Sequence, residues 1–266
     1  MTSTERGGRS EFDPSVPHPA RVYNFWLGGK DNFAADRHAA EQVLRLLPGI
    51  VAGVRANRGF LVETVRYLSG QGIRQFLDVG TGLPAPNNTH EVAQRLAPES
   101  RIVYVDHDPM VVTHAEALLR SSPQGRCAYV EADLRDADFI LDEASSTLDF
   151  SQPVGLMLLA ILQLVPDDAE AQRIVEALAA RLAPGSYIAI SHMTADFAPE
   201  SVMSATRAYN DLAPDPVTPR TKAQLTAFFG GRELVKPGVV SVSRWRPDAA
   251  DDDQELVDLY GAIARV

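Results

Sequence analysis

The amino-acid sequence predicts an α/β fold built on a doubly wound, largely parallel β-sheet, and three observations support this prediction. Short apolar runs with the length of buried strands recur at 76–79, 102–105, 127–132 and 154–159. Between them lie stretches whose apolar residues repeat at helical spacing. Several of the runs end in an acidic residue or a glycine turn, and sheets of this kind bind ligands at the carboxyl ends of their strands.

About seventy residues are predicted to precede this sheet. Residues 1–16 are polar and lack apolar periodicity, which indicates a disordered leader. A first helix ends at the Gly28–Gly29 pair, a second covers 36–47 and a third covers 51–69. These patterns divide the chain into a leader (1–16), an N-terminal helical cap (17–70) and a sheet domain (71–266).

The stretch QFLDVGTGLP, at 75–84, organises the predicted sheet. Its apolar half predicts a buried strand, and Gly80 and Gly82 then allow a tight turn with no Cβ to keep a ligand at a distance. Asn88 and Thr89 are typical of a helix N-terminus. A strand, an open loop and the positive end of a helix form the arrangement with which α/β sheets bind nucleotide-like ligands.

This turn is poorly suited to phosphate groups. The third glycine of a dinucleotide-binding fingerprint is missing, because Leu83-Pro84-Ala85 occupies its place, and the lysine motif of a phosphate-binding loop is missing too. Asp78 lies just before the turn, where a carboxylate can meet the ammonium group of a ligand. A ligand with ribose, adenine and an amine but no phosphate is S-adenosylmethionine (AdoMet), which is therefore the predicted cofactor.

The pattern from Phe76 to Pro84 resembles motif I of the class I AdoMet-dependent methyltransferases. The segment ARVYNFWLGGKDNFAAD, at 20–36, is similar to the ARxYxxxLGGKDNxxAD pattern of one branch, the S-adenosyl methyltransferase family once catalogued as a domain of unknown function. The resemblance implies a Rossmann-like sheet of seven strands, the last of them antiparallel, with an N-terminal helical cap. It also implies cofactor contacts along the first turn, from Asp78, Gly80, Thr81, Gly82 and Pro84.

Two further strand ends are predicted to hold the nucleoside. Asp106 ends the second strand, where its carboxylate can accept both ribose hydroxyls. His107 is placed beside the adenine, with a partly exposed loop histidine as the alternative interpretation. The resemblance implies that Asp133 accepts the adenine amino group and that the backbone of Leu134 meets the ring.

The exit of the fourth strand, Ala160-Ile161-Leu162-Gln163, narrows the acceptor class. It lacks the Asn or Asp, prolines and aromatic residue of the exocyclic-amine methyltransferases of adenine and cytosine. It also lacks a Pro-Cys nucleophile and the acids of metal-assisted catechol-type enzymes. We expect Ala160 to contact the cofactor and Gln163 to contact the acceptor, unless Gln163 simply begins a helix. The predicted acceptor is a small molecule.

Candidate acceptor-binding and catalytic residues come from the cap and from the end of the fifth strand. Tyr23, Asn24, Lys30 and Asn32 are predicted to form a lid over the acceptor, with Tyr23 also a catalytic candidate. The alternative is a turn between helices that carries solvated charges. His192 is the candidate general base, because the pKa of an unperturbed histidine is near ~6.5. The alternative is a histidine bonded to a loop carbonyl.

The C-terminal part of the chain is predicted from the same signals. Residues 245–253 are expected to form an exposed loop. Class I topology requires an antiparallel last strand, which we place at 259–266. The other expected elements are helices over 167–182, 197–210 and 221–229, and strands over 186–192, 233–235 and 239–243.

The composition limits both class and location. The chain has 266 residues, of which 45% are hydrophobic and 23% charged, as is ordinary for a globular protein. A net charge of −10 opposes a nucleic-acid surface, and no apolar run reaches the ~18 residues of a membrane span. Cys127 is the single cysteine, so neither a disulfide nor a cysteine-based zinc site is predicted. We assign no metal, expect a reducing cytoplasm, and predict no oligomeric state.

The predicted activity is AdoMet-dependent methyl transfer to a small-molecule acceptor, by in-line displacement at the sulfonium methyl. Two alternatives remain open. A regulatory protein that binds AdoMet without turnover would share the cofactor residues. A nicotinamide-dependent oxidoreductase would share the fold, but would require a pyrophosphate-binding turn.

Overall fold

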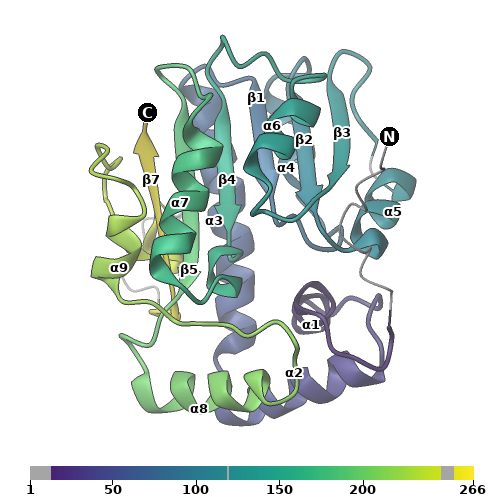
Figure 1. Cartoon of the computed structure of the whole chain (residues 1–266), viewed down its shortest axis with the longest axis vertical. Coiled ribbons are helices and arrows are strands. Elements are labelled where there is room, and N and C mark those ends of the chain that lie inside the picture. The colour runs from purple at the N-terminus through teal and green to yellow at the C-terminus, as the bar shows by residue number, and fades with distance from the viewer. Residues whose placement is uncertain (1–12, 119, 247–254) are drawn as a thin grey trace, which may run out of the picture.

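The computed structural model describes residues 13–118, 120–246 and 255–266. At its centre is a seven-stranded sheet with the order β3-β2-β1-β4-β5-β7-β6 (Figure 1). The strands are β1 (Gln75–Val79), β2 (Arg101–Asp106), β3 (Arg126–Glu131), β4 (Gly155–Leu159), β5 (Tyr187–Met193), β6 (Val240–Ser241) and β7 (Leu259–Arg265).

The first five strands are parallel and β7 is antiparallel to β5, with Ile190 opposite Ala262. The predicted class I sheet with an antiparallel last strand is thus confirmed. The strand order reverses between β1 and β4. The connections after these two strands diverge, and this leaves a crevice at their carboxyl ends where α/β sheets bind ligands.

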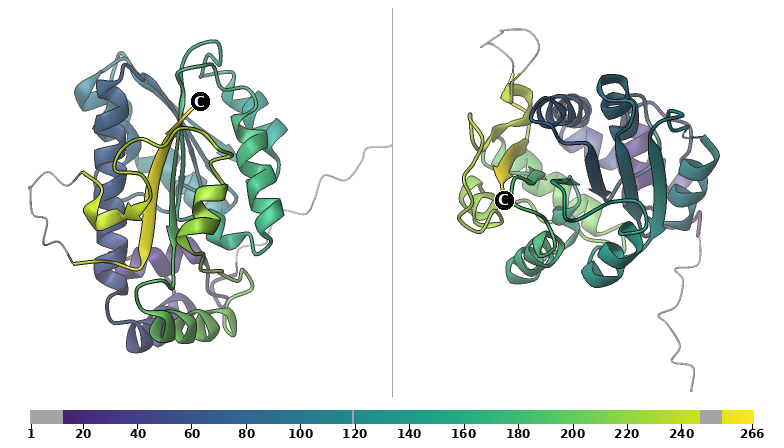
Figure 2. Two further views of the ribbon diagram at one scale, coloured as in Figure 1. Left: turned by 90° about the vertical axis from the view of Figure 1, so that its left-hand side faces the viewer. Right: turned by 90° about the horizontal axis from the view of Figure 1, so that it is seen from above.

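Helices cover both faces of the sheet (Figure 2). Phe76 and Leu77 are neighbours on β1 and point into the two opposite cores, as the alternation of a strand requires. One core is closed by α3 (Ile50–Gly70) and α4 (Thr89–Leu96); the other by α6 (Ala137–Ala144), α7 (Asp168–Ala179) and α9 (Lys222–Ala227). Helix α5 (Pro109–Leu118) follows β2 and contacts β3.

A third apolar cluster builds a cap across the carboxyl ends of the parallel strands. It joins α1 (Pro19–Trp26), α2 (Ala34–Leu46) and α8 (Pro199–Asn210), and α2 packs along α8 (Figure 1). The cap therefore combines N-terminal helices with a helix that the sequence order places after β5. Helix α3 packs mainly on the sheet, and its first residue, Ile50, also packs against the cap.

Two expectations about the C-terminal part of the chain are wrong. The sixth strand is shorter than predicted, since Val240–Ser241 alone forms β6 and Leu234 makes one isolated bridge to Ala264. Pro237 lacks an N–H to donate and Gly238 has a φ of 84°, so the chain turns between these pieces. Trp245 is fully buried rather than exposed, because its ring packs edge-on against Phe60 of α3.

The predicted leader at 1–12 and the loop at 247–254 lie outside the described residues. No helix in the described part of the chain is both long enough and apolar enough to cross a membrane.

Candidate active site

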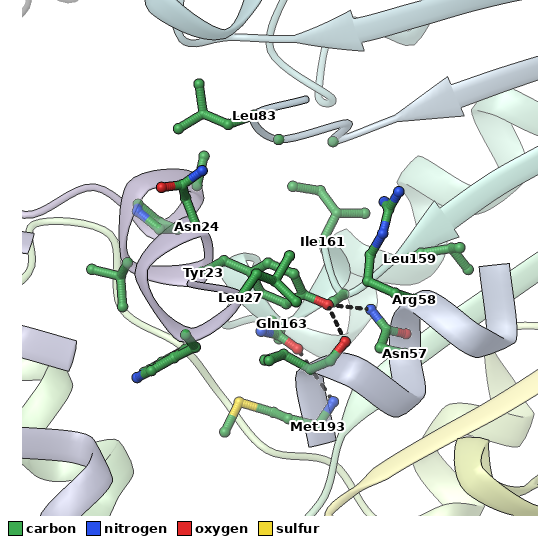
Figure 3. Close-up of a pocket in the computed structure, with 18 of the residues that line it drawn as sticks. Tyr23, Asn24, Leu27, Asn57, Arg58, Leu83, Leu159, Ile161, Gln163 and Met193 are labelled. Atoms are coloured by element: carbon green, nitrogen blue, oxygen red, sulfur yellow. Dashed lines mark hydrogen bonds between the residues drawn. The ribbon is translucent and has the colours of Figure 1, made fainter. Parts of the chain in front are cut away.

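A pocket of about 420 Å³ lies between the carboxyl ends of β1, β2 and β4 and the cap (Figure 3). This volume lies within the range of ordinary small-molecule sites. Its sheet side is formed by the turn after β1, the end of β2 and the exit of β4. Its other side is formed by residues of α1, α2, α3 and α8.

The turn after β1 depends on glycine. Gly80 has a φ of 76° and donates its N–H to the carbonyl oxygen of Val105, at 2.8 Å. A Cβ on Gly80 would collide with the side chain of Ile161. Gly82 has a φ of 65° and donates its N–H to the Oδ2 atom of Asp106, at 2.8 Å. The backbone therefore passes close to the end of β2 and leaves room above the turn.

Asp106 is nearly buried at the end of β2 and lines the pocket. Its Oδ1 atom accepts the N–H of Asp108 at 3.1 Å, while Oδ2 accepts that of Gly82. A carboxylate has about four acceptor positions. Two positions thus remain for the paired hydroxyls of a ribose. The turn and this carboxylate fit the nucleoside of AdoMet.

Asp78 provides the second carboxylate, 5% exposed and on the pocket wall. The hydroxyl of Thr89, at the start of α4, donates to its Oδ2 atom at 2.6 Å. Burial raises the pKa of Asp78 to about 6, although the Thr89 hydrogen bond and the charge of Arg58 oppose this rise. An ammonium group beside Asp78 would relieve the cost of burying the charge, as the predicted role for the AdoMet amine requires.

Arg58 and Asn57, on α3, are pocket residues that sequence reasoning missed. Arg58 donates to the carbonyl oxygens of Pro86 and Asn87, both at 3.1 Å, and so fixes the loop between β1 and α4. Asn57 accepts the hydroxyl of Ser191 at 2.6 Å. Nothing in the sequence of the continuous helix 50–70 indicates that Arg58 faces the loop after β1.

The cap candidates separate into two groups. Tyr23 and Asn24 line the pocket. The Tyr23 hydroxyl donates to Val54 O and accepts from Asn57 Nδ2, both at 3.1 Å (Figure 3). Burial raises the pKa of Tyr23, so the phenol stays protonated at neutral pH. Lys30 is exposed and lies outside the pocket wall, which corrects its expected role as an acceptor contact.

Asn32 also lies outside the pocket wall, and its role is structural. Its buried amide donates to Asn24 Oδ1 at 2.9 Å and to Gly29 O at 3.0 Å. The Asn24 oxygen also accepts the N–H of Asp31 at 3.1 Å. Asn32 therefore holds Asn24 in place at the pocket, instead of meeting the acceptor itself.

The remaining candidate residues come from the β1 turn and from the β4 exit. Thr81 and Pro84 line the pocket, and so does Ala160, whose φ of 54° turns the chain sharply after β4. Gln163 lines it as well, in a short 3₁₀ turn (Leu162–Leu164). The side-chain oxygen of Gln163 accepts the N–H of Met193 at 3.2 Å (Figure 3).

His192 does not reach the pocket, which corrects its prediction as a general base. It is 1% exposed. Its Nδ1 atom lies 2.8 Å from Met193 O, and its Nε2 atom lies 2.9 Å from Nη1 of Arg220. Arg220 can only donate, so it occupies the Nε2 lone pair that a base would need. Burial lowers the pKa of His192 to about 4.

The third strand end also differs from the prediction. The side chain of Asp133 is 46% exposed, forms an ion pair with Arg135 at 3.3 Å, and lies outside the pocket wall. Leu134 is buried in the core on the α6 and α7 face of the sheet. The resemblance alone placed these two residues at the adenine, and the described pocket does not extend to them.

His107 lines the pocket beside Asp106 and meets a residue of the cap there. Its Nε2 atom lies 3.5 Å from the Nε2 atom of His18, the residue that precedes α1. Burial lowers the pKa of His18, and the carboxylate of Asp108 opposes this. The β2 end and the cap are therefore in direct contact at this side of the pocket.

This fold and this pocket define the class I AdoMet-dependent methyltransferase type. The family model of the S-adenosyl methyltransferases matches residues 5–266. The chain belongs to this family, and its cofactor is AdoMet.

Solved structures agree with this assignment. A DUF574 family protein from Streptomyces avermitilis is 46% identical, with 95% of this chain and 98% of that chain covered and a TM-score of 0.91. A protein from Thermobifida fusca, provisionally described as a methyltransferase, is 40% identical over 94% and 95% of the two chains, with a TM-score of 0.86. Human N-acetylserotonin methyltransferase in complex with AdoMet shares the fold, at 15% identity over 94% and 63% of the two chains and a TM-score of 0.52. No curated protein matches the chain.

Proposed function

We propose that this protein transfers the methyl group of AdoMet to a small, largely apolar acceptor. The observation that carries the proposal is one continuous pocket, with the glycine turn and Asp106 at one end and an apolar cap at the other. The cap end is lined mainly by aliphatic and aromatic side chains. They come from α1, α2 and α8 and from the residues that follow α1 and α2: Val22, Trp26, Leu27, Val43, Leu47, Val202, Ala205 and Tyr209.

Each end of the pocket has its own task in this proposal. AdoMet supplies a methyl group that already carries a good leaving group. Asp106 and Asp78 hold the two ends of the cofactor, and the cap side chains exclude water and align the acceptor. Alignment of two reactants can contribute as much as ~7–11 kcal/mol to a rate enhancement.

Alignment, rather than general base catalysis, is the proposed source of rate enhancement. Tyr23 is the predicted catalytic residue that does line the pocket, but its hydroxyl is held by Val54 and Asn57 and stays protonated. We infer that Tyr23 positions the acceptor with its ring. The proposed acceptor therefore attacks through an atom that needs little help in losing its proton.

The proposal is tested by screening small apolar amines, phenols and thiols for release of S-adenosylhomocysteine. Val202 is 1% exposed on the pocket side of α8, and Val202→Phe should fill the acceptor end. We expect Val202→Phe to reduce turnover at least tenfold while the AdoMet Kd, from calorimetry, changes less than threefold. Met203→Phe, on the exposed side of the same helix, is the matched control.

Two outcomes would contradict the proposal. AdoMet binding without a methylated product across the screen would favour a regulatory protein. Binding of NADH in competition with AdoMet, followed by hydride transfer, would favour the oxidoreductase. Thermal unfolding of each variant without ligand separates a filled pocket from a damaged fold.

A further inference from the structure

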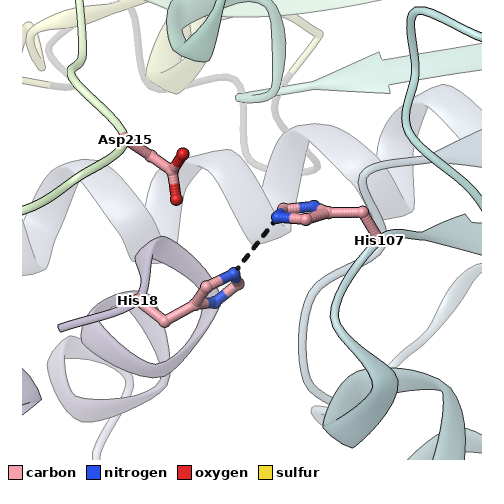
Figure 4. Close-up of side chains that lie close together, drawn as sticks. All are labelled: His18, His107 and Asp215. Carbon is pink, nitrogen blue, oxygen red and sulfur yellow. Dashed lines mark hydrogen bonds between the residues drawn. The ribbon is translucent and has the colours of Figure 1, made fainter. Parts of the chain in front are cut away.

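Three side chains that can bind a metal converge at the edge of the pocket. His18 precedes α1, His107 follows β2, and Asp215 lies in the segment between α8 and α9. One nitrogen or oxygen atom from each lies within 4.8 Å of the other two, and all three residues are partly buried (Figure 4). Because these residues are far apart in the sequence, no local motif predicts that they come together.

A carboxylate lies beside the Nδ1 atom of each imidazole. His18 Nδ1 lies 3.3 Å from Oδ2 of Asp108, and His107 Nδ1 lies 3.8 Å from Oδ1 of Asp106. The N–H of Ala20 also donates to His18 Nδ1, at 3.3 Å. Metal binding through Nε2 requires the proton of each ring to lie on Nδ1, where a carboxylate is near enough to attract it.

The two Nε2 atoms face each other at 3.5 Å and form a hydrogen bond, in which one ring donates to the other (Figure 4). A metal ion between the two nitrogens would take the place of the proton that they share. Tetrahedral Zn²⁺ with Zn–N distances of about 2.0–2.1 Å requires two ligand nitrogens to be about 3.4 Å apart. The observed separation is close to that value.

We propose that His18, His107 and Asp215 bind a divalent transition metal of the Zn²⁺ type, with a fourth position open to water. Two imidazoles and one carboxylate suit zinc and disfavour Mg²⁺ and Ca²⁺, which prefer oxygen ligands only. Asp108 and Asp106 serve as the outer carboxylates that orient metal-bound histidines in many proteins.

The proposed metal joins three segments that the chain order keeps apart. His18 belongs to the cap, His107 to the sheet edge, and Asp215 to the segment that follows α8. Both histidines also line the pocket, so the metal would close the cap onto the sheet beside the cofactor. This inference goes beyond methyl transfer, and the test below requires neither AdoMet nor an acceptor.

The experiment uses the full chain, freed of any purification tag and treated with a chelator. Titration with zinc sulfate against a chromophoric chelator should give one bound Zn²⁺ per chain, with a Kd in the micromolar range or below. Zinc at a hundredfold excess over Kd should raise the Tm by about 5 °C. Co²⁺ in place of zinc should give the strong visible absorption of a tetrahedral site.

Variants connect this binding to the three residues. His18→Gln, His107→Gln and Asp215→Asn should each weaken zinc binding at least tenfold. His38→Gln, on the exposed side of α2, and Asp211→Asn, exposed at the end of α8, are matched controls that should bind as the parent does. The Tm of each metal-free variant shows whether it is folded.

The proposal is overturned if folded parent protein binds no stoichiometric zinc. Equal affinity in the parent and in folded His18→Gln and His107→Gln would also overturn it, since the metal would then lie elsewhere. Methyl transfer can fail or succeed without changing either result.

Discussion

The two ends of the pocket are built by different means. The sheet end is set by backbone geometry: Gly80 and Gly82 have positive φ angles, and their N–H groups bond to Val105 and Asp106. The cap end consists of side chains from α1, α2 and α8. The sheet end is formed by nine consecutive residues, 76–84, together with the ends of the neighbouring strands. The second end exists only once distant helices have packed.

This difference teaches where specificity resides. A backbone turn and two carboxylates can serve any AdoMet-dependent enzyme of this fold, since they meet groups common to every such reaction. In the proposed function the apolar cap meets the acceptor, which differs from one enzyme to another. Changes at the sheet end should therefore affect cofactor binding, and changes at the cap end should affect the acceptor.

The largest effect is expected from Gly80→Ala. The new Cβ would meet the side chain of Ile161 and would also hold a positive φ. Overpacking and backbone strain together should lower the free energy of unfolding by about 3 kcal/mol. Gly82→Ala is the control, because nothing lies within 4 Å of its added Cβ. Gly82→Ala should lower the free energy of unfolding by only about 1 kcal/mol, because it adds backbone strain without a collision. Urea denaturation measures both, and equal losses would show that Ile161 does not confine the turn.

Asp106→Ala should have the next largest effect. Removal of charge-assisted hydrogen bonds, each ~1.5–3 kcal/mol, should raise the AdoMet Kd by roughly 10-fold to 100-fold. Asp133→Ala removes a carboxylate that is exposed and ion-paired with Arg135, so it should change the Kd less than twofold. Calorimetry on both variants separates the positions. A large loss in Asp133→Ala would place the adenine at β3 and extend the site beyond the described pocket.

The sequence allowed the sheet end to be predicted in detail. Strand bounds, the glycine turn and Asp106 follow from local signals: a buried apolar run, residues without Cβ, and a carboxylate at a strand tip. The same logic located Ala160 and Gln163 at the exit of β4, although not the positive φ of Ala160. These features are local because each depends on residues within one turn of the chain.

The cap end could not be predicted in the same way. Lys30 and Asn32 belong to a segment with a strong family pattern, but Asn32 turns inward to hold Asn24, and Lys30 faces solvent. His192 lies near the end of β5, yet Arg220, twenty-eight residues further on, donates to its Nε2 atom. Such partners come from tertiary packing, and a single sequence carries no periodicity that identifies them.

Asp78 should make the AdoMet Kd depend on pH, with a change of about tenfold. Its pKa of about 6 lies above the usual 3.8, so the carboxylate is charged above pH 6 and becomes protonated as pH falls through that value. An ammonium ligand prefers the charged form, and the AdoMet Kd should therefore be about tenfold higher at pH 5 than at pH 7. In Asp78→Asn the affinity should be weak and nearly independent of pH. A persistent pH dependence in that variant would assign the effect to another group, such as His18.

The smallest effect is expected from Tyr23→Phe. The variant keeps the ring but loses the hydroxyl that bonds to Val54 and Asn57, so the free energy of unfolding should fall by about 1 kcal/mol. Tyr209→Phe is the matched control. Its hydroxyl is buried without a hydrogen-bond partner among the described residues, so its loss should not reduce stability.

Turnover decides the role of Tyr23. If the tyrosine only positions the acceptor, kcat with an acceptor from the screen should fall less than threefold in Tyr23→Phe. Loss of a general base would instead reduce kcat by about 10²–10⁴-fold. A fall of that size, with the AdoMet Kd unchanged, would mean that the phenol leaves Val54 and Asn57 during the reaction. The cap end would then contribute proton transfer as well as alignment, and the separation between the two ends of the pocket would have to be redrawn.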